Sequence, residues 1–247
     1  MHILDLSDPE NPTQTSYYTG SGYIHDVYVW NDTAYASAAS SFDVVDVSNK
    51  SQPVLVSESP QLSGIYAHSG WLTEDKRYFI ACEEFNVRDI IVWDLQDRTT
   101  WNLVVPNWQM PTSSTVHNLF IKGNYAHISY YGDGYVVLNI ADPANPYLVG
   151  QYDTYPGGSS GYNGAWGCYP YLPSGNTLIS DIQTGLYVLK FTAADVPPVI
   201  TNLFEEEFVL STDPVTVSSN IFDDNTNRII ERGEYGNIEL QLVNNGD

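Results

Sequence analysis

The sequence predicts an all-β fold: a β-propeller of four-stranded antiparallel blades, followed by a partial immunoglobulin-like β-sandwich. The first observation is a short β-rich run that recurs at intervals of roughly 40 to 50 residues, the period of a propeller blade. These runs are residues 3–6, 44–47, 92–95, 137–140 and 188–191. A second marker recurs at similar intervals and opens a strand-like run each time; its members are His25, His68, His117 and Trp166. No segment longer than a turn shows the 3.6-residue pattern of a helix.

Each repeat divides into four strands, which we name A to D in chain order. In the third repeat, strand A is residues 117–122, and a hairpin turn at Gly123 and Asn124 leads to strand B, residues 125–130. A second turn at 132–134 precedes strand C, residues 135–140, and strand D is residues 147–152. Proline-containing turns, which end a strand cleanly, lie at 7–12, 48–53 and 142–146. A two-sheet sandwich is the alternative, but it does not require one motif to return in phase five times.

The repeats assign residues 1–192 to the propeller, with a partial first blade, three full blades and a last blade that lacks its outer strand. We expect this to be a piece of a longer propeller; alternatively, the two partial blades close one composite blade of a four-bladed ring. Residues 193–200 contain Pro197 and Pro198 and are typical of a linker. Residues 201–247 predict a truncated immunoglobulin-like domain, because they hold several β-like runs over about half the length of such a domain.

Three segments carry a resemblance to a known family: residues 68–79, residues 116–125, and residues 164–166 followed by 169–176. In this order they resemble the choice-of-anchor B family, whose blades are LVIVD-type repeats, and the resemblance covers residues 1 to about 191. It implies a secreted or surface-displayed bacterial β-propeller with variable anchoring modules at its C-terminal end. The resemblance implies no reaction and no catalytic residues.

One rim of the channel is the predicted ligand surface. Strand A begins at the marker residue and strand B runs back, so the end of strand B returns to the same rim. This places there His25, Asp26, His68, Glu83, Glu84, His117, Asn118, Tyr130, Trp166 and Asp181. Such a set can hold a divalent metal, Zn²⁺ or Mn²⁺ if imidazoles ligate and Ca²⁺ if only oxygens do. There are two alternatives to a metal: each histidine tethers its own loop, or the rim forms a polar ligand pocket. Trp166 in the fourth position favours a tether or an aromatic lid over a symmetric metal ring.

Recognisable catalytic groups are scarce. Glu83 and Glu84 are adjacent, so on a strand they point to opposite faces and share one substrate only if the strand has already ended. The sequence contains no G-x-S-x-G elbow and no glycine-rich phosphate loop, and neither cysteine has a histidine next to it in the sequence. The tryptophans offer a sugar-binding platform, but packing between blades is the more frequent role of such residues: Trp71, Trp93, Trp101 and Trp108.

A second cation site is predicted near the C-terminus. Five oxygen-bearing side chains fall within nine residues, a density that suits Ca²⁺, and they are Asp223, Asp224, Asn225, Asn227 and Glu231. The segment lacks the central glycine and the register of an EF-hand, and a solvated acidic turn is the alternative.

Charge and composition restrict the partners. With 9 Lys and Arg against 30 Asp and Glu, a net charge of -21 excludes a phosphate-rich partner such as nucleic acid. No apolar run is long enough for membrane insertion, and the two cysteines cannot build a disulfide framework. We therefore expect a noncatalytic, secreted or cell-surface module for binding or display, with an extracellular protein or glycan as its ligand. A metal-dependent hydrolase or lyase using the rim histidines and glutamates competes with it, and a structural spacer is a third hypothesis.

Overall fold

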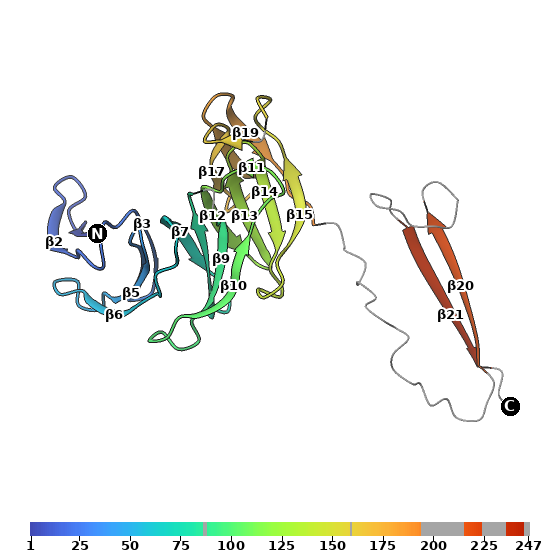
Figure 1. The fold of residues 1–247 in the computed structure, drawn as a ribbon, viewed down its shortest axis with the longest axis horizontal. Helices are drawn as coiled ribbons and strands as arrows, with labels where there is room; N and C mark the ends of the chain where they lie inside the picture. The colour runs from blue at the N-terminus through green and yellow to red at the C-terminus, as the bar shows by residue number, and fades with distance from the viewer. Residues whose placement is uncertain (86–87, 159, 194–214, 224–235, 245–247) are drawn as a thin grey trace. The chain divides into compact units, whose positions relative to one another are not determined.

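The computed structural model describes residues 1–85, 88–158, 160–193, 215–223 and 236–244. The chain divides into two compact units, Met1–Ala194 and Asp195–Asp247. The first unit is a series of antiparallel sheets (Figure 1). Two four-stranded sheets lie within residues 26–108. One contains β3 (Asp26–Trp30), β4 (Thr33–Ser37), β5 (Phe42–Asp46) and β6 (Val54–Glu58), and the other contains β7 (Ala67–Leu72), β8 (Tyr78–Glu83), β9 (Ile90–Asp94) and β10 (Asn102–Trp108).

The third repeat confirms the predicted blade. Its strands are β12 (Asn118–Lys122), β13 (Tyr125–Tyr130), β14 (Gly134–Asn139) and β15 (Tyr147–Tyr152), which pair in that order. Strand A begins one residue later than predicted and strand C one residue earlier. β14 begins early because Gly134 pairs with Tyr130. Gly134 has φ of 80°, and its Cβ, if present, would lie 2.3 Å from the carbonyl oxygen of Tyr152, so this position favours glycine.

The two partial repeats also have the predicted strands. β1 (His2–Asp5) pairs with β2 (Thr13–Tyr17), as strands C and D of the first repeat. β17 (Ala165–Tyr169), β18 (Thr177–Asp181) and β19 (Gly185–Leu189) form a three-stranded sheet, as strands A to C of the last. A short parallel pair between β11 (Ser113–Ser114) and β16 (Ser160–Gly161) was not predicted; it joins the loops that lead into two consecutive blades.

The core of the first unit lies between successive blades. Alternate residues of β8 face opposite neighbours, because side chains of a strand alternate between its faces. Phe79 packs with Tyr35 and Phe42 of the preceding blade, whereas Ile80 packs with the cluster that contains residues of the following blade. Trp93 and Trp101 are buried in these contacts, as their predicted packing role requires. Every blade therefore depends on its neighbours for burial of its apolar faces.

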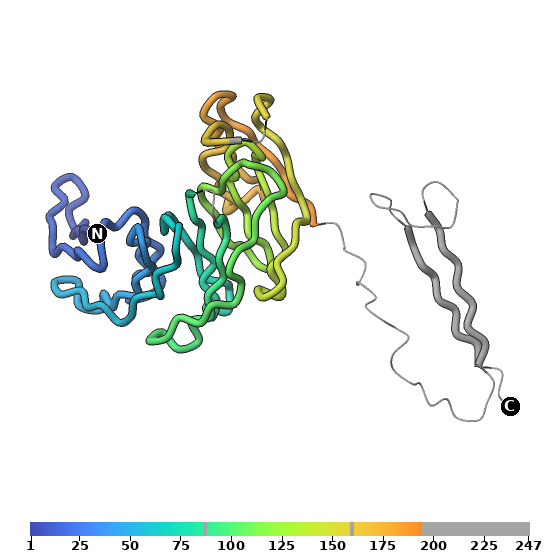
Figure 2. Tube along the Cα trace, viewed as in Figure 1, coloured from blue at the N-terminus to red at the C-terminus, as the bar shows by residue number. Residues whose placement is uncertain are grey.

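The first strands of the blades position the candidate site. β3, β7, β12 and β17 follow one another, each in contact with the next, and Figure 2 shows the chain passing from blade to blade in sequence order. Isolated bridges connect the end of a strand B to the start of the next strand A, from Ala39 to Ala67 and from Tyr131 to Ala165. The starts of the A strands and the ends of the B strands thus meet at one rim, as predicted.

The second unit is described only in part. β20 (Val215–Asp223) and β21 (Gly236–Asn244) form an antiparallel pair whose register runs from Val215 opposite Asn244 to Asp223 opposite Gly236. The rest of the predicted immunoglobulin-like domain lies outside the described residues, so this sandwich stays a prediction. Among the residues that the structure describes, no helix is long and apolar enough to cross a membrane.

Candidate functional site

Four aromatic rings form a continuous row at this rim. The ring centroids of His25 and His68 are 4.3 Å apart, those of His68 and His117 4.5 Å, and those of His117 and Trp166 5.0 Å. Each ring comes from a different blade and lies within one residue of the start of β3, β7, β12 or β17. Residues separated by more than 40 positions in the chain are thus in contact, because equivalent positions of successive blades point toward one axis.

The four rings differ in exposure. His68 and His117, in the middle of the row, are only 3% and 4% exposed. His25 and Trp166, at its two ends, are exposed to solvent. The row therefore has a buried polar centre between two accessible ends.

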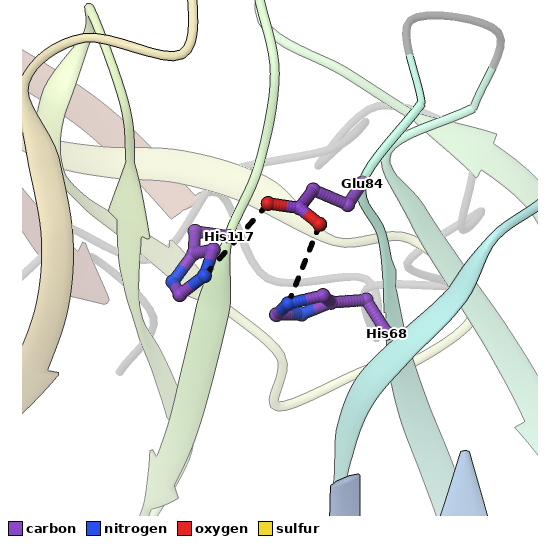
Figure 3. Close-up of side chains that lie close together, drawn as sticks. All are labelled: His68, Glu84 and His117. Atoms are coloured by element: carbon purple, nitrogen blue, oxygen red, sulfur yellow. Dashed lines mark ion pairs between the residues drawn. The ribbon is translucent and has the colours of Figure 1, made fainter. Parts of the chain in front are cut away.

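Glu84 faces the two central imidazoles (Figure 3). Its Oε2 lies 3.6 Å from Nε2 of His68, and its Oε1 lies 3.8 Å from Nε2 of His117. Both distances exceed those of a hydrogen bond. One ligand atom from each of the three residues lies within 4.8 Å of the other two. Three groups able to bind a metal ion therefore converge on one small space without hydrogen bonding to one another.

Neighbouring groups fix the orientation of two of these side chains. Nδ1 of His117 donates to the carbonyl oxygen of Trp166 in the next blade, which leaves Nε2 directed at Glu84. The hydroxyl of Tyr131 donates to Oε1 of Glu84 at 2.7 Å, and the hydroxyl of Tyr162 donates to the backbone oxygen of Glu84 at 3.0 Å. The tether predicted for the rim histidines is thus present at His117.

Burial keeps both central histidines neutral. It lowers the pKa of His68 to about 3, with smaller contributions from His117 and His25. Burial likewise lowers the pKa of His117 below its usual value. At neutral pH each ring then has an unprotonated nitrogen. Nδ1 of His68 is buried and has no hydrogen-bond partner among the described residues.

Three predicted rim residues lie elsewhere. Glu83 is the last residue of β8 and is fully buried, and its carboxylate oxygens have no partner within the described part of the chain. Tyr130 is buried between blades, where its hydroxyl donates to Asp89. Asp181 is buried and accepts a hydrogen bond from Thr154 at 2.7 Å. The structure therefore uses Tyr130 and Asp181 in packing and loop contacts, and it separates Glu83 from Glu84 as strand alternation predicts.

Asp26 and Asn118 begin β3 and β12, beside the row. Asp26 accepts a hydrogen bond from the backbone N–H of Val27 at 2.8 Å, and burial raises the pKa of its carboxyl. Oδ1 of Asn118 is buried without a partner among the described atoms. Both residues neighbour the row in sequence, and Asp26 does not belong to the converging group of His68, Glu84 and His117.

Three tyrosines of the site were missed by the sequence reasoning: Tyr66, Tyr131 and Tyr162. Tyr66 contacts Nδ1 of His25 at 3.2 Å, and the other two bind Glu84 as described. A signal for Tyr66 exists, because Tyr23 and Tyr66 both stand two residues before a marker histidine. Tyr131 directly follows strand B, as Glu84 does in the preceding blade.

The predicted Ca²⁺ site near the C-terminus is not described by the structure. Asp223 is the last residue of β20. The other four residues, Asp224, Asn225, Asn227 and Glu231, lie outside the described residues.

Comparison with known proteins identifies the repeats. Residues 21–67 and 115–154 match the family model of the LVIVD repeat. The two segments contain β3 to β6 and β12 to β15, so each matched segment includes one complete four-stranded blade. A search of curated proteins found no match.

Solved structures with a similar fold include β-propellers. A protein from Lactobacillus plantarum is 14% identical, with a TM-score of 0.60 over 76% of this chain and 60% of that one. The periplasmic gluconolactonase of Pseudomonas aeruginosa is 13% identical, with a TM-score of 0.60 over 76% and 58%. The β-propeller domain of Cps50 (Swd1) from Myceliophteria thermophila is 12% identical, with a TM-score of 0.52 over 77% and 64%.

The chain thus covers less than two thirds of each of these structures, and the likeness concerns the fold. Together, the matched repeats, the four-stranded sheets and the structural likeness lead to one conclusion. The chain carries LVIVD repeats on a β-propeller fold.

Proposed function

We propose that this propeller is a noncatalytic binding or display module at the cell surface or outside the cell, and that its ligand binds at the rim. The observation that carries the proposal is the row of four rings, one from each of four successive blades. A ligand seated on it would contact all four blades at once, on strands whose inter-blade packing makes them rigid.

The chemistry of the rim favours a particular kind of ligand. Exposed aromatic side chains lie near the row, and they are Tyr23, Phe85 and Tyr162. They connect to it through ring contacts, as in the 5.2 Å pair of Tyr66 and Phe85 and the 5.3 Å pair of Tyr131 and Tyr162. Aromatic faces around one carboxylate suit stacking of sugar rings or of neutral and cationic protein side chains. The net charge of -21 disfavours anionic ligands.

The location rests on the resemblance to the choice-of-anchor B family over residues 1 to about 191. An extracellular protein or glycan is therefore the proposed partner. The acidic composition agrees with a protein kept soluble by charge outside the cell.

Binding to glycan and peptide arrays tests this function. The variant with His25→Ala and Trp166→Ala removes both accessible ends of the row. It should lose at least about 10-fold in affinity, as truncation of aromatic anchors does. The matched control is Trp30→Ala, an exposed tryptophan at the opposite end of β3. A wild-type protein that binds no array component, or equal binding by the rim variant, would refute the proposal.

A metal-dependent hydrolase or lyase is the second candidate, and the set of His68, Glu84 and His117 favours it. Two imidazoles and one carboxylate form the donor set of some catalytic zinc sites. The likeness to a gluconolactonase, at 13% identity, does not extend to its activity. Turnover of a panel of esters and lactones in the presence of Zn²⁺, abolished by Glu84→Gln, would replace the binding module by this enzyme.

A further inference from the structure

We propose that Nε2 of His68, Nε2 of His117 and the carboxylate of Glu84 bind one divalent transition-metal ion, with Zn²⁺ as the best fit. The inference rests on the proposed function, because the metal would bind two of the four rings in the row, but the ion itself needs no organic ligand. The first step is geometric. The ligand atoms come from two blades and lie within 4.8 Å of one another.

The spacing is close to that of a bound metal. With Zn–N and Zn–O bonds of about 2.0 to 2.2 Å, ligand atoms of a tetrahedral site are about 3.3 to 3.5 Å apart. Glu84 already lies 3.6 Å and 3.8 Å from the two Nε2 atoms. The widest pair needs to close by no more than about 1.5 Å, which small rotations of three side chains provide.

The second step concerns what the groups lack without a metal. His68 is more than nine-tenths buried, yet its Nδ1 has no hydrogen-bond partner in the described part of the chain. Its Nε2 is too far from Glu84 for a hydrogen bond. A buried ring nitrogen without a hydrogen-bond partner is unfavourable, so the burial of this imidazole calls for a compensating interaction. A metal ion held by Nε2 would provide a strong interaction for the ring, although Nδ1 would still lack a partner.

The third step is the support around the ligands. A metal-binding histidine almost always donates its second ring nitrogen to an oxygen, as His117 does to the carbonyl of Trp166. Ligating carboxylates are hydrogen bonded in turn, as Glu84 is by Tyr131 at 2.7 Å.

The donor set selects the class of metal. Two neutral nitrogens with one carboxylate suit Zn²⁺, Fe²⁺ or Mn²⁺, whereas Ca²⁺ and Mg²⁺ prefer oxygen ligands alone. His25 contacts the ring of His68 but is not part of the converging group. Three protein ligands leave a fourth position for water or for a donor atom of the rim ligand. The exposed ring of Trp166 lies 5.0 Å from the ring of His117, so a bound ligand would both stack and coordinate.

Titration of the whole chain with the metal alone tests the inference. After treatment with a chelator, the protein is titrated with Zn²⁺ by calorimetry and with Co²⁺ by visible absorption. We expect one equivalent bound, with affinity reduced at least about 100-fold in His68→Ala, His117→Ala and Glu84→Gln, and about 10-fold in Tyr131→Phe. Tyr131 is a positioning residue, so its variant should keep one equivalent and shift the Co²⁺ absorption.

Two controls match these variants. Glu83→Gln changes the adjacent carboxylate, which is buried and is not part of the converging group, and His2→Ala removes an exposed histidine. Both should bind as the wild type does. Glu84→Gln preserves side-chain size at a partly exposed position, so it keeps the result interpretable if a histidine variant fails to fold.

Two results would overturn the inference: no stoichiometric metal bound by the folded wild type, or binding that survives Glu84→Gln and both histidine substitutions. The array experiment is separate. Loss of metal binding with retained, Trp166-dependent ligand binding refutes only the metal site, and the converse refutes only the binding module.

Discussion

Replacement of Tyr130 by phenylalanine should destabilise the first unit by about 3 kcal/mol. Tyr130 ends β13, and its hydroxyl donates to the carboxylate of Asp89 in the preceding blade. The same hydroxyl accepts the backbone N–H of Met110 at 3.0 Å. All of these groups are buried, so no water replaces the lost oxygen without rearrangement.

The magnitude follows from the two lost hydrogen bonds. A hydrogen bond to a charged group contributes about 1.5 to 3 kcal/mol, and a buried N–H left without an acceptor costs about 1 to 3 kcal/mol. Asp89 keeps only a long hydrogen bond from Thr115, at 3.3 Å, among its side-chain partners. For a unit of this size, about 3 kcal/mol corresponds to a decrease in Tm of about 6 to 12 °C.

Equilibrium unfolding in urea measures the change in the free energy of unfolding. Tyr125→Phe is the matched control, since Tyr125 begins the same strand and its hydroxyl makes no hydrogen bond within the described residues. It should change stability by less than about 0.5 kcal/mol. Equal stability of Tyr130→Phe and the wild type, or equal losses in both variants, would refute the assignment of Tyr130 to a buried contact between blades.

Three further predictions concern the same unit. Burial lowers the pKa of His127 to about 4 from an ordinary value of 6.5. Between these pH values the unfolded chain binds more protons than the folded chain, so the free energy of unfolding falls by about 3 kcal/mol as the pH drops from 6.5 to 4. His127→Gln should flatten this pH dependence in urea unfolding, and an unchanged slope would contradict the prediction. Gly134→Ala should destabilise the first unit by at least about 2 kcal/mol, because the new Cβ would lie 2.3 Å from a backbone oxygen. Gly123→Ala should destabilise it by about 1 kcal/mol through the positive φ alone, because nothing lies within 4 Å of the new Cβ. Thermal unfolding compares the two variants, and equal losses of stability would argue against the close approach at Gly134. Cys82 and Cys168 are free and buried, and burial raises the pKa of both thiols. A chromogenic disulfide reagent should therefore label them only at the rate of unfolding. Rapid labelling of the native protein would be inconsistent with their burial.

The strands of the propeller could be predicted because each blade repeats the same signals. Alternating apolar residues, turn glycines and proline-ended strands agree with one another in each repeat, and β15 has the predicted bounds, residues 147–152. The meeting of His25, His68, His117 and Trp166 follows from their common position at the start of strand A. Periodicity was therefore sufficient for the fold and for the row of rings.

The remaining site residues depend on where each strand B ends. Side chains alternate between faces on a strand, so a difference of one residue decides whether a side chain reaches the rim. β8 ends at Glu83 and β13 at Tyr130, and the residues that follow, Glu84 and Tyr131, are the ones that meet at the site. A sequence pattern does not locate a strand end to one residue. For this reason the prediction included Glu83 and Tyr130 and omitted Tyr131.

The side-chain contacts of Asp181 could not be predicted for a different reason. It ends β18, as predicted, but its carboxylate binds Thr154 and the backbone N–H groups of Gln183 and Thr184. These partners lie in loops whose path the repeat pattern does not determine. The hydrogen bonds lower the pKa of its carboxyl and fix it in a loop contact.

Two successive blades bring His68, Glu84 and His117 to one point at the row of rings. Anomalous diffraction at the zinc edge, from crystals of the whole chain grown with one equivalent of Zn²⁺, tests this most directly. We expect one strong peak between the two Nε2 atoms and the carboxylate of Glu84, with the rings of His25 and Trp166 on either side of the histidines. Histidine rings dispersed over unrelated surfaces, or a peak at any other place in the chain, would show that the blades do not form this site.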